Sequence, residues 1–280
     1  MTELFNRVVE LTVGKPGEEG LFFTEIKIAF SIKKDRSSKG NTGEITLFNV
    51  GPDTRSKLND KGLKYEIKAG YAGLANIPLV NTISSGDILE IATQRQGADI
   101  VTKLTIGEAV KTLSEAKLDK SYSEGISVKK VIKDLAGTLE VGLGTLKDIA
   151  SDTLNSGYSS SGKSKDRLDE LTSKLGLSWN IQNDELNVYK EGGSTSDTAV
   201  VLSSETGLLK AYKTKSQKQG ATALVDVVKF EALLNPEVKI GRQVKIISIP
   251  NDLDTFVTVR SLTFDGDNKD GSFLVKGEAS

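Results

Sequence analysis

A strict alternation of apolar and polar residues over residues 63–71 constrains the fold more than any other feature of the sequence. Every second position in this stretch carries an apolar or aromatic side chain, namely Leu63, Tyr65, Ile67, Ala69 and Tyr71. Successive side chains of a β-strand point to opposite faces, so this pattern predicts a strand with one buried and one solvated face. The chain is therefore expected to build a half-buried sheet here.

The residues before this strand predict a second strand and the connection between the two. Ile45 and Leu47 alternate with their neighbours, and Gly51, Pro52 and Asp53 then end the strand. Proline cannot donate to a strand ladder, and an aspartate can close a turn with its own side chain. Residues 44–71 are thus expected to form strand, turn, short helix and strand, with no reaction centre among them.

The same strand pattern extends over residues 8–110. Val9, Leu11 and Val13 alternate, residues 26–32 alternate strictly, and residues 88–91 and 104–106 are apolar runs bounded by turn signals. We expect about six short strands without a long helix between them, which is typical of an antiparallel barrel or sandwich.

After Ser121 the apolar period becomes helical. Ser127 is a suitable N-cap, and Gly137 is well placed to end a helix whose apolar positions are Val128, Val131, Ile132 and Leu135. A second helical stripe is predicted at Leu143, Leu146, Ile149, Ala150 and Leu154. A third helix is predicted after Ser164, with Gly176 as its end and Leu168, Leu171 and Leu175 on its buried side.

A hairpin and a second β region complete the chain. Residues 177–181 and 186–188 alternate on either side of a turn at residues 182–185, and the small polar residues 191–197 form the expected hinge. Strand patterns return at residues 200–202, 224–233, 244–249, 256–264 and 273–275, whereas residues 199–215 carry only a weak pattern. The predicted fold class is α+β, mainly β, with a β domain at residues 1–115, an α+β insert at residues 116–192 and a second β domain at residues 193–280.

Composition excludes several kinds of chemistry. The 280 residues include no cysteine and no histidine, which removes thiolate nucleophiles, Cys-containing and His-containing zinc sites and the commonest general base. The 37 basic and 38 acidic residues nearly cancel, so sequence-specific nucleic-acid binding driven by a basic surface is not expected. No apolar run could span a membrane, and the first residues do not resemble a signal peptide. We assign no catalytic, cofactor-binding or metal-binding residues, and predict that the protein is not an enzyme.

The segment from Gly157 to Ser164 matches the phosphate-binding pattern G-x-x-x-x-G-K-S, with Lys163 as its lysine. A helix follows, as that mechanism requires. The segment upstream has a helical rather than a buried-strand pattern, and Asp226 is a weak candidate for a magnesium ligand. A loop that caps the following helix explains the same residues, so nucleotide binding is kept as the alternative function.

Three other features have a structural and a functional interpretation. Residues 265–271 resemble the start of a calcium loop, but Lys269, Asp270 and Lys276 stand where that loop needs other residues, and Asp-Gly pairs are ordinary hairpin signals. Three carboxylates suggest glycosidase chemistry or the solvated first turns of a helix, namely Asp166, Asp169 and Glu170. Trp179 could stack on a ligand, but its strand register favours core packing.

Several stretches resemble the central baseplate hub proteins of bacteriophage tails, a fold related to the spike-carrying hubs of type VI secretion. The first is F-N-V, a proline turn, T-R-S-K-L and a charged strand ending in K-A-G-Y. The second is G-Y-S-S-S-G-K-S followed by an L-x-x-L helix, a glycine and a tryptophan strand. Others are S-S-E-T-G-L-L, L-L-N-P-E-V-K-I-G-R-Q-V-K-I and V-R-S-L-T-F-D-G-D. The resemblance covers nearly the whole chain and assigns the Gly157 to Ser164 segment to a structural loop.

This resemblance implies a structural function in the virion, after assembly in the host cytoplasm. In such hubs the two β domains resemble tail-tube subunits, and a homotrimer forms a pseudo-sixfold ring between the sixfold tube and the threefold spike. The implied partners are the tail tube protein, the spike, and wedge and tape-measure proteins, without direct membrane insertion. Residues 63–71 and 241–249 are candidate barrel framework, with their solvated charges packing the ring. A non-catalytic carbohydrate-binding tail accessory is a further alternative.

Overall fold

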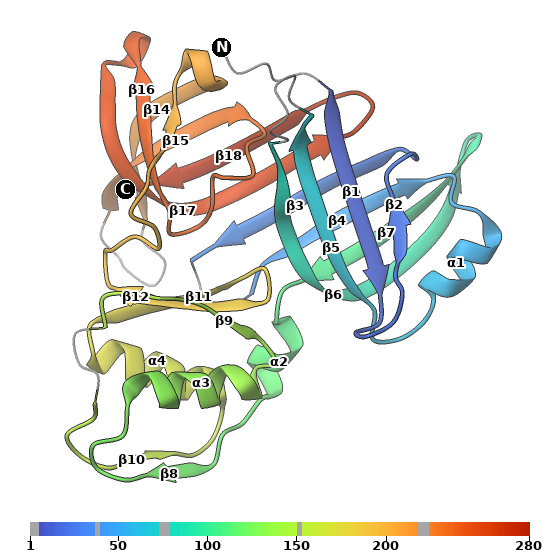
Figure 1. The fold of residues 1–280 in the computed structure, drawn as a ribbon. Helices are drawn as coiled ribbons and strands as arrows, with labels where there is room; N and C mark the ends of the chain where they lie inside the picture. The colour runs from blue at the N-terminus through green and yellow to red at the C-terminus, as the bar shows by residue number, and fades with distance from the viewer. Residues whose placement is uncertain (1–5, 37–39, 73–78, 150–152, 218–223) are drawn as a thin grey trace.

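Three groups of elements make up the computed structural model, which describes residues 6–36, 40–72, 79–149, 153–217 and 224–280. A first β unit contains strands β1 to β7, an insert follows, and a second β unit contains strands β13 to β18. The two β units lie side by side, and the insert, green to yellow in the ribbon, packs below them (Figure 1). The fold is mainly β with a few helices, which confirms the predicted fold class.

The first β unit contains seven strands and one short helix. Their bounds are β1 Arg7–Gly14, β2 Leu21–Phe23, β3 Ile28–Asp35, β4 Thr42–Phe48, α1 Pro52–Leu58, β5 Lys64–Tyr71, β6 Leu79–Gln96 and β7 Asp99–Gly107. The predicted order of strand, turn, short helix and strand is confirmed by β4, α1 and β5. Proline at the first position of α1 is favourable there because that N–H has no partner within a helix.

The strands of this unit follow the order β3, β4, β7, β6, β5, β1 and β2. The predicted alternation over residues 63–71 is confirmed, because Tyr65, Ile67 and Ala69 of β5 are buried while Lys64 and Glu66 are only half-buried. The long strand β6 pairs with β5 over residues 79–87 and with β7 over residues 87–96. One 18-residue strand therefore pairs with two neighbours along different parts of its length.

The insert is built from three helices and five strands. Their bounds are α2 Val110–Glu115, β8 Lys120–Tyr122, α3 Val128–Thr138, β9 Gly142–Leu146, β10 Tyr158–Ser160, α4 Ser164–Lys174, β11 Leu177–Gln182 and β12 Glu185–Lys190. The predicted helices α3 and α4 and the hairpin of β11 and β12 are confirmed. The predicted end of α3 at Gly137 is wrong, because the helix continues to Thr138. The turn residues Asn183 and Asp184 both adopt positive φ, which matches the handedness of a two-residue hairpin turn.

The predicted helix over residues 143–154 is wrong. Residues 142–146 form β9, which pairs in parallel with β12. Gly142 and Gly144 lower the helical propensity of this stretch. The side chain of Asn187 in β12 also accepts a hydrogen bond from the Thr145 N–H at 2.8 Å, so β12 satisfies this backbone group as well. The predicted contribution of Ala150 lies outside the described residues.

The second β unit contains six strands, with bounds β13 Val200–Leu202, β14 Leu208–Gln217, β15 Leu224–Leu233, β16 Gln243–Ser248, β17 Leu253–Asp267 and β18 Phe273–Ala279. Four of them run in the order β14, β15, β18 and β17, and β16 pairs with both β17 and β13. The strand β14 was only weakly indicated by the sequence, because Lys213, Thr214 and Lys215 give little apolar alternation.

Two hydrophobic clusters hold these parts. One cluster runs through both β units, and a separate one fills the insert around Val131, Leu168 and Trp179. The division of the chain at residues 115 and 192 stays a prediction. Within the described residues, no helix is long and apolar enough to cross a membrane.

Candidate assembly edges of the sheet

The two β units are joined within the chain by a strand pair. Residues 261–267 of β17 run antiparallel to β3, with Ser261 opposite Asp35 and Asp267 opposite Ala29. Across this joint Ser31 donates a hydrogen bond to the carboxylate of Asp265 at 2.7 Å. The joint makes β14, β15, β18, β17, β3, β4, β7 and β6 one continuous run of eight hydrogen-bonded strands.

The two units have the same layout in this run. In the first unit, one row of paired residues crosses the sheet through Ser31, Glu44, Thr105 and Glu90. In the second unit, the corresponding row passes through Tyr212, Lys229, Glu278 and Ser261. A β-bulge directly precedes Glu90 in β6 and Ser261 in β17. Strand β14 is therefore the counterpart of β3, and β6 is the counterpart of β17.

Strand β14 and residues 90–96 of β6 each have one open edge. Among the described residues, β14 pairs with β15 alone, and residues 90–96 of β6 pair with β7 alone. Both strands are long, and their outward N–H and C=O groups lack a strand partner there, which makes such edges ready to pair with another chain. Tyr212 is 39% exposed, and Leu209, at a bulge in β14, is 57% exposed.

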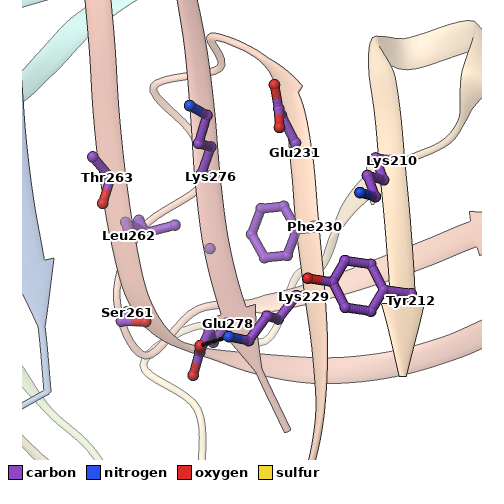
Figure 2. Close-up of a pocket in the computed structure, with 11 residues that line it drawn as sticks. Lys210, Tyr212, Lys229, Phe230, Glu231, Ser261, Leu262, Thr263, Lys276 and Glu278 are labelled. Carbon is purple, nitrogen blue, oxygen red and sulfur yellow. Dashed lines mark ion pairs between the residues drawn. The ribbon is translucent and has the colours of Figure 1, made fainter. Parts of the chain in front are cut away.

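The eight-stranded run has one polar face. Alternate residues of its strands are charged or hydroxylated, and oppositely charged neighbours pair across strands. The pairs are Lys229 with Glu278 at 2.8 Å, Lys276 with Asp265 at 3.5 Å and Lys103 with Glu44 at 2.8 Å. Figure 2 shows this face over the second β unit, where it forms a shallow hollow of about 310 Å³.

The Gly157 to Ser164 segment has no free phosphate cradle. The N–H of Gly162 and the hydroxyl of Ser161 both donate to the carboxylate of Asp119, at 3.0 and 2.8 Å. The buried Ser164 donates its N–H to the Ala116 carbonyl and accepts a hydrogen bond from Thr138. Because protein groups already occupy these donors, the geometry supports a structural loop that leads into α4.

Two carboxylates of α4 are engaged within the chain, and the third, Asp166, is exposed in the first turn of the helix. Asp169 accepts a hydrogen bond from the Trp179 indole at 2.8 Å, and Trp179 is buried in the insert core as its strand register predicted. Glu170 pairs with Arg167 and Lys174 on the helix surface. These groups form no cleft with two facing carboxyls, so glycosidase chemistry has no support here.

The calcium-like turn holds cations that belong to the protein. Lys27 lies 3.2 Å from Asp267 and 3.0 Å from Asp270. Asp267 also accepts the N–H groups of Lys269 and Asp270. Burial alone would raise the pKa of Asp267, but these N–H groups and Lys27 outweigh it and lower that pKa. In the described parts of the chain, no group of three or more acidic side chains could hold a metal ion.

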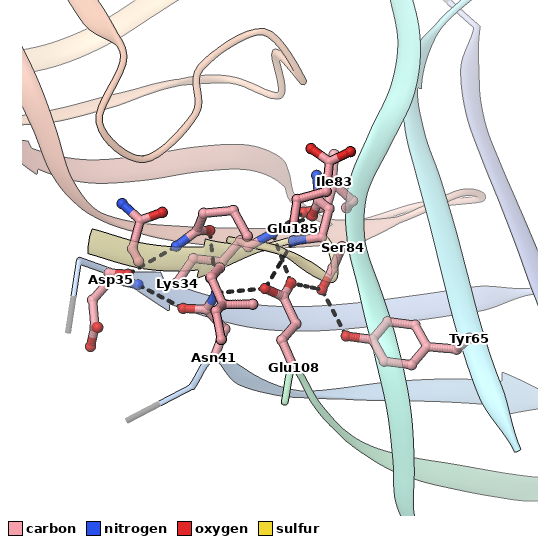
Figure 3. A network of polar contacts seen from close by, with 12 residues as sticks. Lys34, Asp35, Asn41, Tyr65, Ile83, Ser84, Glu108 and Glu185 are labelled. Atoms are coloured by element: carbon pink, nitrogen blue, oxygen red, sulfur yellow. Dashed lines mark hydrogen bonds and ion pairs between the residues drawn. The ribbon is translucent and has the colours of Figure 1, made fainter. Parts of the chain in front are cut away.

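A buried polar network, which the sequence did not indicate, ties the insert to the first β unit (Figure 3). Lys34 and Glu108 are 2.8 Å apart, with 4% and 0% of their side chains exposed. Ser84 and Asn41 donate to the same carboxylate at 2.7 and 2.6 Å. Lys34 also donates to Asn183 in the β11–β12 turn at 2.6 Å. The insert therefore docks through charge and hydrogen bonds, and not through a shared apolar core.

Acid is expected to weaken the insert through Asp134. Lys120, at 2.6 Å, and Lys130, at 2.8 Å, hold the pKa of the Asp134 carboxyl well below its usual range. A folded-state pKa below the unfolded one stabilises the fold above the unfolded value of about 4, and this contribution is lost as the pH falls towards the folded value. Asp134→Asn should therefore reduce the free energy of unfolding in urea at about pH 7 and much less at about pH 2, close to the folded-state pKa.

Asp53→Asn, at an exposed position of α1, is the matched control for this measurement. An Asp134→Asn effect that stays constant between the two pH values would contradict the proposed electrostatic origin.

The fold consists of two β units around an α+β insert. No family model and no curated protein matches the sequence. Among solved structures, the 43 kDa tail protein of prophage MuSo2 from Shewanella oneidensis is similar with a TM-score of 0.66 and 9% identity, over 97% of this chain and 98% of that chain. The tail protein from Neisseria meningitidis MC58 gives a TM-score of 0.66 and 11% identity, over 98% of this chain and 96% of that one.

A third similar structure is the E. coli c3393 protein, described as a type VI secretion system component similar to T4 bacteriophage tail proteins. Its TM-score is 0.56 at 10% identity, and the match covers all of this chain and 75% of that chain. The chain thus has the fold of phage tail proteins and of a type VI secretion component, which agrees with the resemblance stated from its sequence.

Proposed function

We propose that the protein is a structural hub of a bacteriophage tail baseplate, in which three chains close a pseudo-sixfold ring between the tail tube and the spike. The fold shared with phage tail proteins supports a structural role in the virion tail. The observation that supports the trimeric ring is the internal joint, in which β17 pairs with β3. The counterparts of these two strands, β6 and β14, each have an edge without a strand partner among the described residues, so β6 of one chain can pair with β14 of the next.

The internal joint also predicts the register between chains. Ser31 of β3 pairs with Asp265, which follows Ser261 by four residues. Tyr212 is the counterpart of Ser31, and Gln94 follows Glu90 by four residues. In the ring, Gln94 of one chain therefore lies opposite Tyr212 of the next, and Gln96 lies opposite Lys210. Such a head-to-tail contact forms a ring when its rotation closes, and six like units require three chains.

The polar face becomes the inner wall of this ring. Three runs of eight strands would join edge to edge, and their cross-strand ion pairs leave a hydrated wall with few unpaired charges. The proposed partners are the tail tube above the ring and the spike below it. Wedge proteins are proposed to lie around the ring, and the tape-measure protein within it. This role requires no chemical reaction, in keeping with the absence of histidine and cysteine from the sequence.

A cysteine pair tests the ring directly, because the natural chain contains no cysteine. Gln94→Cys combined with Tyr212→Cys places one thiol at each outer edge of the eight-stranded run of a chain. The two positions become neighbours across the proposed contact between chains, which we call the seam. Oxidation should give covalent dimers and then a covalent trimer of three times 30.0 kDa, because directly opposed strand residues approach disulfide distance.

The control combines Tyr212→Cys with Thr93→Cys, whose side chain lies on the other face of β6 because successive strand residues alternate. This control should cross-link much less. Monomers alone at every protein concentration, both by mass in solution and after oxidation of the Gln94 and Tyr212 double variant, would rule out the ring.

A further inference from the structure

The turn between β17 and β18 is tied to the other β unit by its backbone. Arg7 of β1 donates to the carbonyl oxygens of Asp267, Asp270 and Gly271 at 3.2, 3.0 and 3.0 Å. Its guanidinium also lies 5.4 Å from the centre of the Phe273 ring. Arg7 of the first unit is thus hydrogen-bonded to three carbonyl groups of this turn in the second unit.

Two more residues complete this attachment. The side chain of Asn268 accepts the Ile28 N–H at 2.9 Å and donates to the Ile26 carbonyl at 2.8 Å, so it extends the strand pairing beyond the end of β3. Lys27 binds the carboxylates of Asp267 and Asp270, as described above. Residues 267–271 therefore form a latch that holds the β3–β17 joint closed.

The open edges lack these groups. The counterpart turn, between β6 and β7, consists of Gly97 and Ala98 between the paired residues Gln96 and Asp99. It has no counterpart of Asn268, and Asp99 already accepts a hydrogen bond from Asn49 of its own unit at 2.8 Å.

The receiving side differs as well. In β14 the counterpart of Ile28 is Leu208, because Leu208 pairs with Ala232 as Ile28 pairs with Leu47. Gly207 therefore stands where the first unit has Lys27, and a glycine offers no cation to the turn of a neighbouring chain.

We propose that the latch makes the joint within each chain permanent and leaves the three seams between chains as the places where the ring opens and closes. This proposal rests on the ring described under the proposed function. In this proposal the calcium-like turn at residues 267–271 keeps the two units of one chain together while neighbouring chains separate. Every second seam of the pseudo-sixfold ring then breaks before the others.

Hydrogen exchange of the backbone amides, followed by mass spectrometry on the trimeric protein, tests this difference between seams. Peptides that cover β14 and residues 90–96 of β6 should exchange at least about tenfold faster than peptides that cover β3 and residues 261–267 of β17. A tenfold difference corresponds to only about one or two hydrogen bonds, fewer than the latch supplies. Equal protection of the two kinds of seam in a trimer would overturn the latch proposal and leave the ring intact.

A variant pair separates the latch from the ring. Asn268→Ala removes two latch hydrogen bonds and should speed exchange in β3 and β17, whereas Lys269→Ala, which changes only an exposed side chain of the same turn, should not. This comparison can be made in a monomer as well as in a trimer. Unchanged exchange in Asn268→Ala would overturn the latch, while failure of the cysteine cross-link would overturn the ring and the seams with it.

Discussion

Replacing Glu108 by alanine is expected to destabilise the folded chain by about 3–5 kcal/mol, the usual cost of removing one partner of a buried ion pair. The substitution leaves Lys34 with only 4% of its side chain exposed and no counter-charge at 2.8 Å. Burial lowers the pKa of Lys34, and Glu108 is the main group that opposes this effect. Ser84 and Asn41 would also each lose one hydrogen-bond acceptor. The midpoint of urea denaturation at neutral pH measures the change.

The double variant Lys34→Met and Glu108→Leu separates the charge from the packing. Replacing both members of a buried ion pair by apolar residues of similar volume is often nearly neutral, so the double variant should be clearly more stable than Glu108→Ala. If the double variant unfolds as early as Glu108→Ala, the unpaired lysine is not the source of the loss.

Gly266→Ala is expected to cost about 1–3 kcal/mol through overpacking at the joint between the two β units. A Cβ at position 266 would lie 2.3 Å from the Cζ of Phe30 and within 2.9 Å of both Cε atoms. Phe30 is buried and pairs directly with Gly266 across the joint, so the ring has to move and loosen the strand pair. Thermal unfolding and hydrogen exchange in β3 would report the loss.

Gly137→Ala is the matched control for this substitution. It lies inside α3, where a Cβ would meet no atom within 4 Å, and alanine in a helix is more favourable than glycine by up to about 1 kcal/mol. The two Gly→Ala changes should therefore shift stability in opposite directions. A Gly266→Ala protein as stable as the natural chain would show that the joint is not closely packed.

Strands with a clean apolar alternation were predictable from the sequence. Tyr65 and Ile67 of β5, and Ile246 of β16, are buried on alternate positions as expected. The helix α3 was equally clear, because Val128, Val131 and Leu135 fall on one face and are all buried. In each case the pattern follows from the geometry of a single element, which is written locally in the chain.

Elements whose conformation depends on a partner outside their own segment were missed or misread. Residues 142–146 carry a helical stripe, but β12 supplies a parallel strand partner, and they become β9. The lysine-rich β14 has little alternation, and its strand form depends on pairing with β15. Glu108 follows the end of β7 without any motif, and only the fold brings it to Lys34.

The candidate framework residues were placed correctly as strands but not at the open edges. Residues 63–71 and 241–249 contain β5, which pairs with β1 and β6, and β16, which pairs with β13 and β17. Lys64 of β5 pairs with Asp184 of the insert at 3.1 Å. Ring packing by the solvated charges of these strands stays a prediction. The open edges proposed for the seams are those of β14 and of residues 90–96 of β6, as far as the structure describes the chain.

The sequence by itself determined the mainly β class, the α+β insert between two β regions, and the resemblance to hub proteins, because alternation, helical period and turn residues are local properties of the chain. Only the tertiary structure decided that β17 joins β3, that β14 and residues 90–96 of β6 have an open edge among the described residues, and that Asp267 pairs with Lys27. Strand order, edge exposure and charge pairing depend on which distant segments meet, and a one-dimensional pattern does not specify those meetings.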